Sequence, residues 1–413
     1  MNKSQALTMV RQVVGTLGVR GLLIAAGFIS SVATARLLGP EGKGVYFYWA
    51  TVASLIAQFG NFGLQSSNTY FLAKGQASLA ALASNALLVS VVGGGALGGL
   101  VFFGRYLLNG LAPDPWAYGV ATIILACTGL YFMFGTNLLI ALGRIKAYNG
   151  FELINRYFVL AAIIAVAWLL PQAPALLLAS AAASMSICIP LCLYLRRLGP
   201  GWSPSLTLIR RGIGYSARAY LITALGFLML RLNTFVLPYF VDDAALGTWS
   251  IAAQMMDVIN IVPSTVALIL LPGIIREQDP YRLMKRSVGW VGAVLMGICL
   301  LTAAVGDDFI VHAYGERFSS AYPILLWGLP GVFCLGLIAI YSQYLASVGM
   351  PFTQAWIWAA GLCAEAVLAV CLIPSTGIVG GMVALSCGYL LVLAMIAMTA
   401  RRHYLGTLHG PAQ

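Results

Sequence analysis

Runs of about 20 apolar residues recur from one end of this chain to the other, and each run is long enough to cross a membrane as an α-helix. The chain is 61% hydrophobic and only 8% charged, whereas a soluble domain carries about 25% charged residues. A chain of 413 residues with this composition cannot cover its apolar side chains with a polar surface. The sequence therefore predicts an all-α, polytopic integral membrane protein.

The apolar runs divide into about twelve predicted membrane helices that are joined by short polar loops. The loop at 196–211, which is rich in arginine, proline and glycine, divides the chain near its middle. We expect a six-helix lobe at 1–198, an inter-lobe loop at 199–211, and a second six-helix lobe with a short tail at 212–413, arranged around a central cavity. The predicted helices cover 13–36, 44–71, 79–104, 117–142, 152–171, 174–195, 212–240, 244–273, 288–306, 318–346, 352–373 and 377–400.

Basic residues indicate the orientation of these helices. Of the 23 lysines and arginines, 15 fall in the tails and in the loops on the side of the termini, and 4 fall in loops on the opposite side. Lysine and arginine are enriched in cytoplasmic loops, so both termini are predicted to be cytoplasmic. The opposite loops are acidic, which agrees with that orientation.

Several other classes of function are excluded by the same pattern. The net charge of +11 comes from residues between the apolar runs, so it indicates membrane orientation and not nucleic-acid binding. No histidine lies in an apolar run beside the cysteines, so we expect no metal site. The glycines around Lys43 do not form a phosphate-binding loop, because Leu37 and Gly44 stand where that motif needs a glycine and a hydroxyl residue.

The stretch at 35–50 is instead predicted to be an outer turn between the first two helices. Gly39-Pro40 should break the first helix, and Gly44 should permit the tight turn. Tyr46, Tyr48 and Trp49 would then form an aromatic belt at the membrane interface. A faint internal match aligns Gly44 with Gly247, which indicates a parallel repeat of two halves.

The same stretch resembles a known family. The run "RLLGPEGKGVY", Arg36 to Tyr46, is similar to the turn after helix 1 of the lipid-linked oligosaccharide flippases. These Wzx-like proteins are the polysaccharide-transporter branch of the multidrug/oligosaccharidyl-lipid/polysaccharide exporter superfamily. The stretch "LRLNTFVLPYF", with Pro263 and Leu271-Pro272 further on, resembles helices 7 and 8 of that family. The resemblance implies the two-lobed fold of that superfamily and a place in the bacterial cytoplasmic membrane.

Ionisable residues within the predicted helices are the candidates for function, since a charge at mid-depth costs several kcal/mol. Arg20 and Arg231 lie in the first helix of each half, which in the family fold face each other across the cavity. Asp257 and Glu365 lie near the middle of their helices and would couple an ion or balance the arginines. The alternative is that these four groups neutralise each other as buried pairs. Many family members carry an acid where this chain has Asn233, so an ion-coupling role is not transferred to that position.

Other polar residues extend the candidate site. Arg218 lies inside the seventh predicted helix and either binds substrate or extends to the inner headgroups. Glu152 and Arg156 are four residues apart and are expected to pair near the cytoplasmic end of the fifth helix. Such polar residues face protein or water, where they would bind sugars or join helices. The predicted substrate-binding residues are Arg20, Arg231, Arg218, Asn233 and one stripe on the second helix, Gln58, Asn61, Gln65 and Asn68.

These observations predict a transporter and not an enzyme. The expected cargo is a polyprenyl-pyrophosphate-linked oligosaccharide, moved from the inner to the outer leaflet by alternating access for cell-surface polysaccharide assembly. We expect no cofactor. A proton or sodium gradient is the candidate energy source for transport. The expected partners are the lipid-linked sugar, membrane lipid and polysaccharide assembly proteins. Two alternatives stay open: a cation-coupled exporter of drugs or small molecules, and a membrane polymerase or ligase, which the short loops disfavour.

Overall fold

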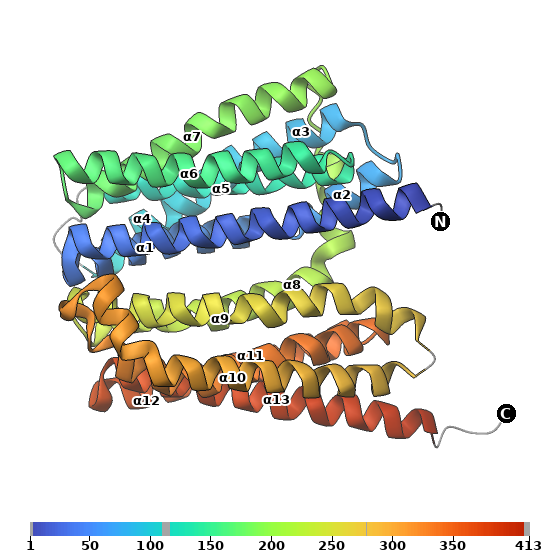
Figure 1. Ribbon diagram of the computed structural model, residues 1–413. Helices are drawn as coiled ribbons and strands as arrows, with labels where there is room; N and C mark the ends of the chain where they lie inside the picture. The colour runs from blue at the N-terminus through green and yellow to red at the C-terminus, as the bar shows by residue number, and fades with distance from the viewer. Residues whose placement is uncertain (1–2, 110–115, 278, 409–413) are drawn as a thin grey trace. The chain divides into compact units, whose positions relative to one another are not determined.

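The computed structural model describes residues 3–109, 116–277 and 279–408, and within them the chain is helical. These residues form thirteen α-helices with short π- and 3-10 segments (Figure 1), and contain no strand. The all-α membrane fold predicted from the apolar runs is therefore confirmed. The helices are α1 Lys3–Gly60, α2 Leu64–Ala73, α3 Leu79–Leu88, α4 Gly94–Asn109, α5 Trp116–Ala141, α6 Ile145–Leu169, α7 Ala173–Leu198, α8 Leu206–Val236, α9 Asp243–Arg276, α10 Pro280–Tyr314, α11 Ala321–Ser347, α12 Pro351–Thr376 and α13 Ile378–Leu408.

Eleven described helices are long and apolar enough to cross a membrane. The apolar part of α1, Gly18–Gly60, has 43 residues, whereas about 20 residues cross a bilayer. Gly39 divides it with a φ of 69° and a ψ of −177°, so the predicted helix break at Gly39-Pro40 is confirmed. α1 is therefore long enough for two of the twelve predicted crossings.

Neighbouring residues show that the two parts of α1 run in opposite directions. Before the break, Arg20 interacts with Tyr148 and Gly27 lies against Arg156, so α1 runs parallel to α6. After the break, the rings of Trp49 and Tyr118 stack 5.7 Å apart, and Gly60 lies against Leu130. This second part is therefore parallel to α5, which joins α6 through a short turn.

The chain forms two compact units. The first comprises residues 1–38 and 45–220, and the second comprises 39–44 and 221–413. α8 passes from the first unit into the second after Tyr220. The short segment 39–44 therefore belongs to the second unit, although the residues on both sides of it belong to the first.

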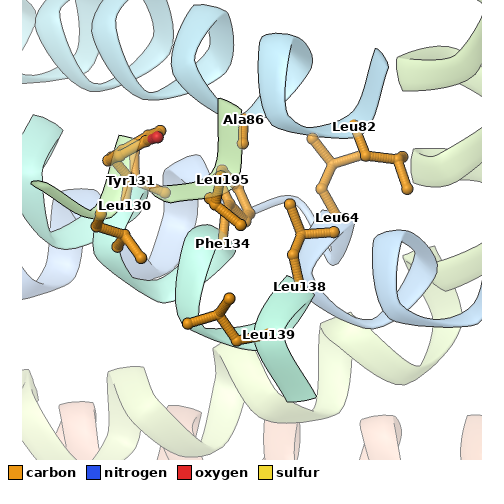
Figure 2. Close-up of a cluster of buried hydrophobic side chains, with 10 residues drawn as sticks. Leu64, Leu82, Ala86, Leu130, Tyr131, Phe134, Leu138, Leu139 and Leu195 are labelled. Atoms are coloured by element: carbon orange, nitrogen blue, oxygen red, sulfur yellow. The ribbon is translucent and has the colours of Figure 1, made fainter. Parts of the chain in front are cut away.

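The core of the first unit is centred on α5. This helix is apolar on every side, which is typical of a helix surrounded by others. Leu130, Phe134 and Leu138 of α5 are fully buried, and they pack with residues of α2, α3 and α7 (Figure 2). In α4, a Cβ at Gly94 or Gly98 would lie 3.1 Å or 2.9 Å from α5 atoms. These two glycines thus allow α4 to pack closely on α5.

In the second unit, α11 packs against α9, α10 and α13. Three glycines of α11 permit this packing. A Cβ at Gly328 would lie 2.5 Å from the sulfur of Met256, and one at Gly331 would lie 2.7 Å from Oγ of Ser386. Gly336 lies in the same way against Leu295 and Pro263. Close approach of helix backbones through small residues is the usual way in which membrane helices pack.

The structure corrects the predicted role of Gly44. This residue is helical, and a Cβ on it would overlap the backbone oxygen of Asp243. Reciprocally, a Cβ on Gly247 would overlap the backbone oxygen of Pro40. Gly44 thus contacts the carbonyl four residues before Gly247, and Gly247 contacts the carbonyl four residues before Gly44. Gly44 serves close packing within the second unit, and the two residues that the internal match aligns contact each other.

The placement of Trp49 in the predicted aromatic belt after the first helix is also wrong. Trp49 is only 3% exposed and stacks on Tyr118, so it packs inside the first unit. The Tyr46 hydroxyl forms a hydrogen bond of 3.2 Å with Ser180 Oγ of α7. These side chains join α1 to α5 and α7. Contacts between helices far apart in the sequence cannot be read from a local cluster of aromatic residues.

Candidate functional site

Arg231 and Asp257 form an ion pair in the second unit. Arg231 lies near the end of α8, Asp257 lies in α9, and Nη2 of the arginine is 2.7 Å from Oδ2 of the acid. Their side chains are 17% and 33% exposed, so the pair is partly buried. The structure therefore brings together two of the four ionisable residues that the sequence singled out.

Glu365 of α12 is the most deeply buried of these candidates, with no exposed surface. Asn233 of α8 donates a hydrogen bond from Nδ2 to its Oε1 at 2.7 Å. The second oxygen, Oε2, has no partner among the described residues. An ionised carboxylate in such a place costs several kcal/mol, so Glu365 needs a proton or a bound cation to offset its charge.

Three aromatic side chains with unpartnered polar atoms are connected to this acid, Tyr389 directly, Trp358 through Tyr389 and Trp249 through the shared neighbour of Asn233, Gly381. Tyr389 interacts with Glu365, Asp257 and Arg231, and its ring meets the ring of Trp358 at 6.5 Å. Among the described residues, the Tyr389 hydroxyl, the Nε1 atoms of Trp249 and Trp358, and Oδ1 of Asn233 have no hydrogen-bond partner. Buried tyrosine and tryptophan normally find a partner for their polar atom. We call Asn233, Glu365, Trp249, Trp358 and Tyr389 the Glu365 cluster.

Two glycines of α13 lie against the cluster. A Cβ on Gly381 would lie 3.4 Å from both Asn233 Oδ1 and the Trp249 ring, which is ordinary contact, and a Cβ on Gly388 would lie 3.1 Å from Glu365 Cβ. A side chain at Gly388 would therefore crowd the acid. Sequence reasoning missed Trp249, Trp358 and Tyr389, because an aromatic residue in an apolar run carries no mark of what it contacts.

The predicted stripe of amides is not one face of a continuous helix. α1 ends at Gly60 and α2 begins at Leu64, with Phe62 and Gly63 at φ values of 46° and 77° between them. Asn61 Oδ1 accepts a hydrogen bond from the Gln65 backbone at 3.0 Å, so this amide closes the break. Asn61 and Asn68 are buried, and Gln58 and Gln65 are half-buried.

The remaining candidate arginines are placed as follows. Arg20 is exposed on α1 in the first unit and interacts with Tyr148. Its joint action with Arg231 stays a prediction, because the two residues belong to different units. The backbone of Arg218 is part of α8, and its side chain lies outside the described residues. In the part of the chain that the structure describes, no group of three His, Cys, Asp or Glu could hold a metal ion.

Glu152 and Arg156 are not where the sequence placed them. The fifth helix was expected at 152–171, but α6 spans Ile145–Leu169. Both residues therefore lie well inside the helix and not near its first residues. The polar residues between Ile145 and Glu152 weaken the apolar signal there, which is why the predicted start was too late.

Known structures share this architecture at low sequence identity. Lipid II flippase MurJ in its inward closed conformation superposes with a TM-score of 0.76 at 11% identity, over 95% of this chain and 87% of that chain. An inward-facing multidrug resistance MATE family transporter of the MOP superfamily gives 0.74 at 11% identity, over 94% and 96%. A point mutant of the Vibrio cholerae MATE transporter VcmN gives 0.65 at 16% identity, over 97% and 98%. The chain thus has the MOP-superfamily fold.

Sequence comparison gives the family. A search of curated protein sequences finds no match. The model of the family described as "Polysaccharide biosynthesis protein" matches residues 33–323, which is more than half of the chain. This match includes the Gly39 break, the Arg231–Asp257 pair and Asn233. The chain is a multi-pass membrane protein that belongs to the polysaccharide biosynthesis protein family.

Proposed function

We propose that this protein translocates a polyprenyl-pyrophosphate-linked oligosaccharide across the bacterial cytoplasmic membrane. The cargo moves from the inner to the outer leaflet by alternating access and then enters cell-surface polysaccharide assembly. The observation that carries the proposal is the set of charged groups inside the spans, Arg231, Asp257 and Glu365, in a member of a polysaccharide biosynthesis family. No bond in the cargo needs to be made or broken for this task.

The Arg231–Asp257 pair supports binding of a diphosphate. The guanidinium fork matches phosphate oxygens, and charge-assisted hydrogen bonds are strong where water is scarce. Asp257 offsets the charge of Arg231 at 2.7 Å in the absence of cargo. A diphosphate carries more negative charge than one carboxylate, so it competes with Asp257 for the guanidinium.

The Glu365 cluster supports coupling to an ion gradient. Glu365 has one free oxygen in a fully buried place. Entry of a proton or a sodium ion at that oxygen removes the cost of its charge. Tyr389 interacts with Glu365 and with the Arg231–Asp257 pair. Ion entry at Glu365 and cargo binding at Arg231 would therefore both act on Tyr389.

The experiment measures binding of a polyprenyl diphosphate sugar to the purified protein in nanodiscs, with the matching monophosphate as comparison. We expect tighter binding of the diphosphate, weakening with added salt, and loss of that preference in Arg231→Ala. Gradient-driven translocation of the lipid in proteoliposomes should likewise be greater for the diphosphate than for the monophosphate, and this preference should be lost in Arg231→Ala. Absence of diphosphate binding by the wild-type protein would overturn the proposal.

A cation-coupled exporter of small molecules is the second candidate, and the buried acid Glu365 favours it. An exporter of cationic drugs uses cavity acids, not arginines, to hold its cargo. Binding of organic cations that is abolished by Glu365→Gln and unaffected by Arg231→Ala would establish this function in place of the flippase.

Orientation is tested separately. From the distribution of basic residues we expect both termini and the 196–211 loop to be cytoplasmic. In a cysteine-free background, a membrane-impermeant thiol reagent added outside should label a cysteine at position 307 but not one at position 204. Labelling of position 204 from outside would reverse the assignment.

A further inference from the structure

Arg156 lies at a depth where a charge is costly. It is near the middle of α6, a 25-residue helix that is itself a candidate membrane span. Its side chain is exposed rather than packed in the core. A charged side chain near the middle of a span is expensive to keep there and marks a functional site by default.

Arg156 has no ion-pair partner among the residues that the structure describes. Glu152, one helical turn earlier, and Tyr46 interact with it electrostatically. In the described part of the chain, however, no carboxylate lies within ion-pair distance of the Arg156 guanidinium, and no acceptor receives a hydrogen bond from it. The N–H donors that do not face the α1 backbone are therefore available to a ligand.

Gly27 of α1 leaves room for the guanidinium because it has no side chain. A Cβ at Gly27 would lie 2.5 Å from Nη2, 3.4 Å from Cζ and 3.7 Å from Nε of Arg156. Three atoms of the guanidinium group thus lie over the α1 backbone at this one residue. By contrast, a Cβ at Gly21 on the same helix would meet nothing within 4 Å.

A second arginine lies on the same face of α1. Arg20 precedes Gly27 by two helical turns, which places both on one face of α1, about 10 Å apart along the axis. Arg20 interacts with Tyr148 of α6, while Arg156 lies over Gly27. We call Arg20, Gly27, Tyr148, Glu152 and Arg156 the α1–α6 seam. All of it belongs to the first unit.

We propose that the α1–α6 seam binds the diphosphate of the lipid-linked cargo through Arg156, with Arg20 as the second cation along the same path. This inference rests on the proposed function and names a binding residue that lies in the first unit. The phosphate of an anionic phospholipid has similar chemistry, so the experiment includes both ligands. The diphosphate is the expected ligand because it carries more charge and can accept hydrogen bonds from several guanidinium donors at once.

The test measures binding of a polyprenyl diphosphate sugar to full-length protein in nanodiscs of zwitterionic lipid. Arg156→Ala should weaken binding about tenfold or more, and Arg156→Lys should weaken it less, because lysine keeps the charge but loses the fork. Gly27→Ala should also weaken binding, because its methyl group displaces the guanidinium. Gly21→Ala is the matched control and should bind like the wild-type protein. Adding Gly27→Ala to Arg156→Ala should cause no further loss.

Membrane abundance and melting temperature of each variant separate a binding role from a structural one. Both should stay near wild type in Arg156→Lys and Gly27→Ala, because the methyl group meets only the end of a flexible side chain. Wild-type binding that is unchanged in Arg156→Ala and Gly27→Ala would overturn this inference and leave the proposed function standing. If the wild-type protein binds no diphosphate sugar, the proposed function fails. Arg156-dependent binding of phosphatidylglycerol alone would then overturn the inference as well.

Discussion

The two units treat their membrane-embedded charges in opposite ways. In the second unit, Arg231 is paired with Asp257 at 2.7 Å and Glu365 is fully buried against Asn233. In the first unit, Arg156 is exposed over Gly27, and Glu152 does not form an ion pair with it among the described residues. A paired charge responds only to a competitor that displaces its partner, whereas an unpaired charge is ready for a ligand. Under the proposed function, the first unit would receive an anion and the second would exchange one.

The largest expected effect concerns the buried acid of the second unit. Glu365→Ala removes the acceptor for the Asn233 amide and leaves a cavity, which should cost about 2–4 kcal/mol of stability. Glu365→Gln keeps an oxygen for Asn233, so its melting temperature in detergent should stay close to wild type. This variant lacks the carboxylate, so gradient-driven transport should be lost. A Glu365→Gln protein that transports normally would exclude Glu365 from coupling.

The next effect compares the acids that accompany the two arginines. Asp257→Ala leaves the guanidinium of Arg231 without its partner and should cost about 1–2 kcal/mol, since the pair is partly exposed. Glu152→Ala is the matched change in the first unit and should cost less than about 0.5 kcal/mol. Thermal melting of the purified proteins measures both. Equal losses of stability in the two variants would remove the distinction between a paired and an unpaired arginine.

The smallest effect concerns polar groups that the first unit uses for structure. The Tyr220 hydroxyl donates to the backbone oxygens of Gln58 and Phe59 at 2.6 Å and 3.1 Å, beside the break between α1 and α2. Tyr220→Phe should cost about 1 kcal/mol. Tyr157→Phe removes one exposed bond to the Leu22 oxygen and serves as the control, with a smaller expected loss. A Tyr220→Phe protein as stable as this control would show that the break is held by other contacts.

The sequence allowed the membrane class and the helix break at Gly39 to be predicted, because apolar runs and Gly-Pro are local signals. Arg231, Asp257 and Glu365 were recognisable for the same reason, since each interrupts an apolar run. Their partners were not, because the contacts of Asn233 with Glu365 and of Tyr389 with the charged groups join helices far apart in the sequence. The position of Arg156 was misjudged because polar residues at the start of α6 concealed seven residues of helix.

The break after Asn61 was missed for a different reason. Amides at spacings of three and four residues predict one face of a helix, but Asn61 turns its side chain to the Gln65 backbone and ends the pattern. Side chains of asparagine compete with the helix for backbone hydrogen bonds. The flanking Gly60 and Gly63 were the available signal of that competition.

The reciprocal contact of Gly44 and Gly247 has a consequence for taking the molecule apart. Because the segment 39–44 belongs to the second compact unit, no single cut of the chain separates the two units cleanly. A fragment that begins at residue 221 would lack the backbone that covers Gly247, and its partner fragment would carry that backbone without its contact. Two co-expressed halves would have to find each other before either could complete its fold.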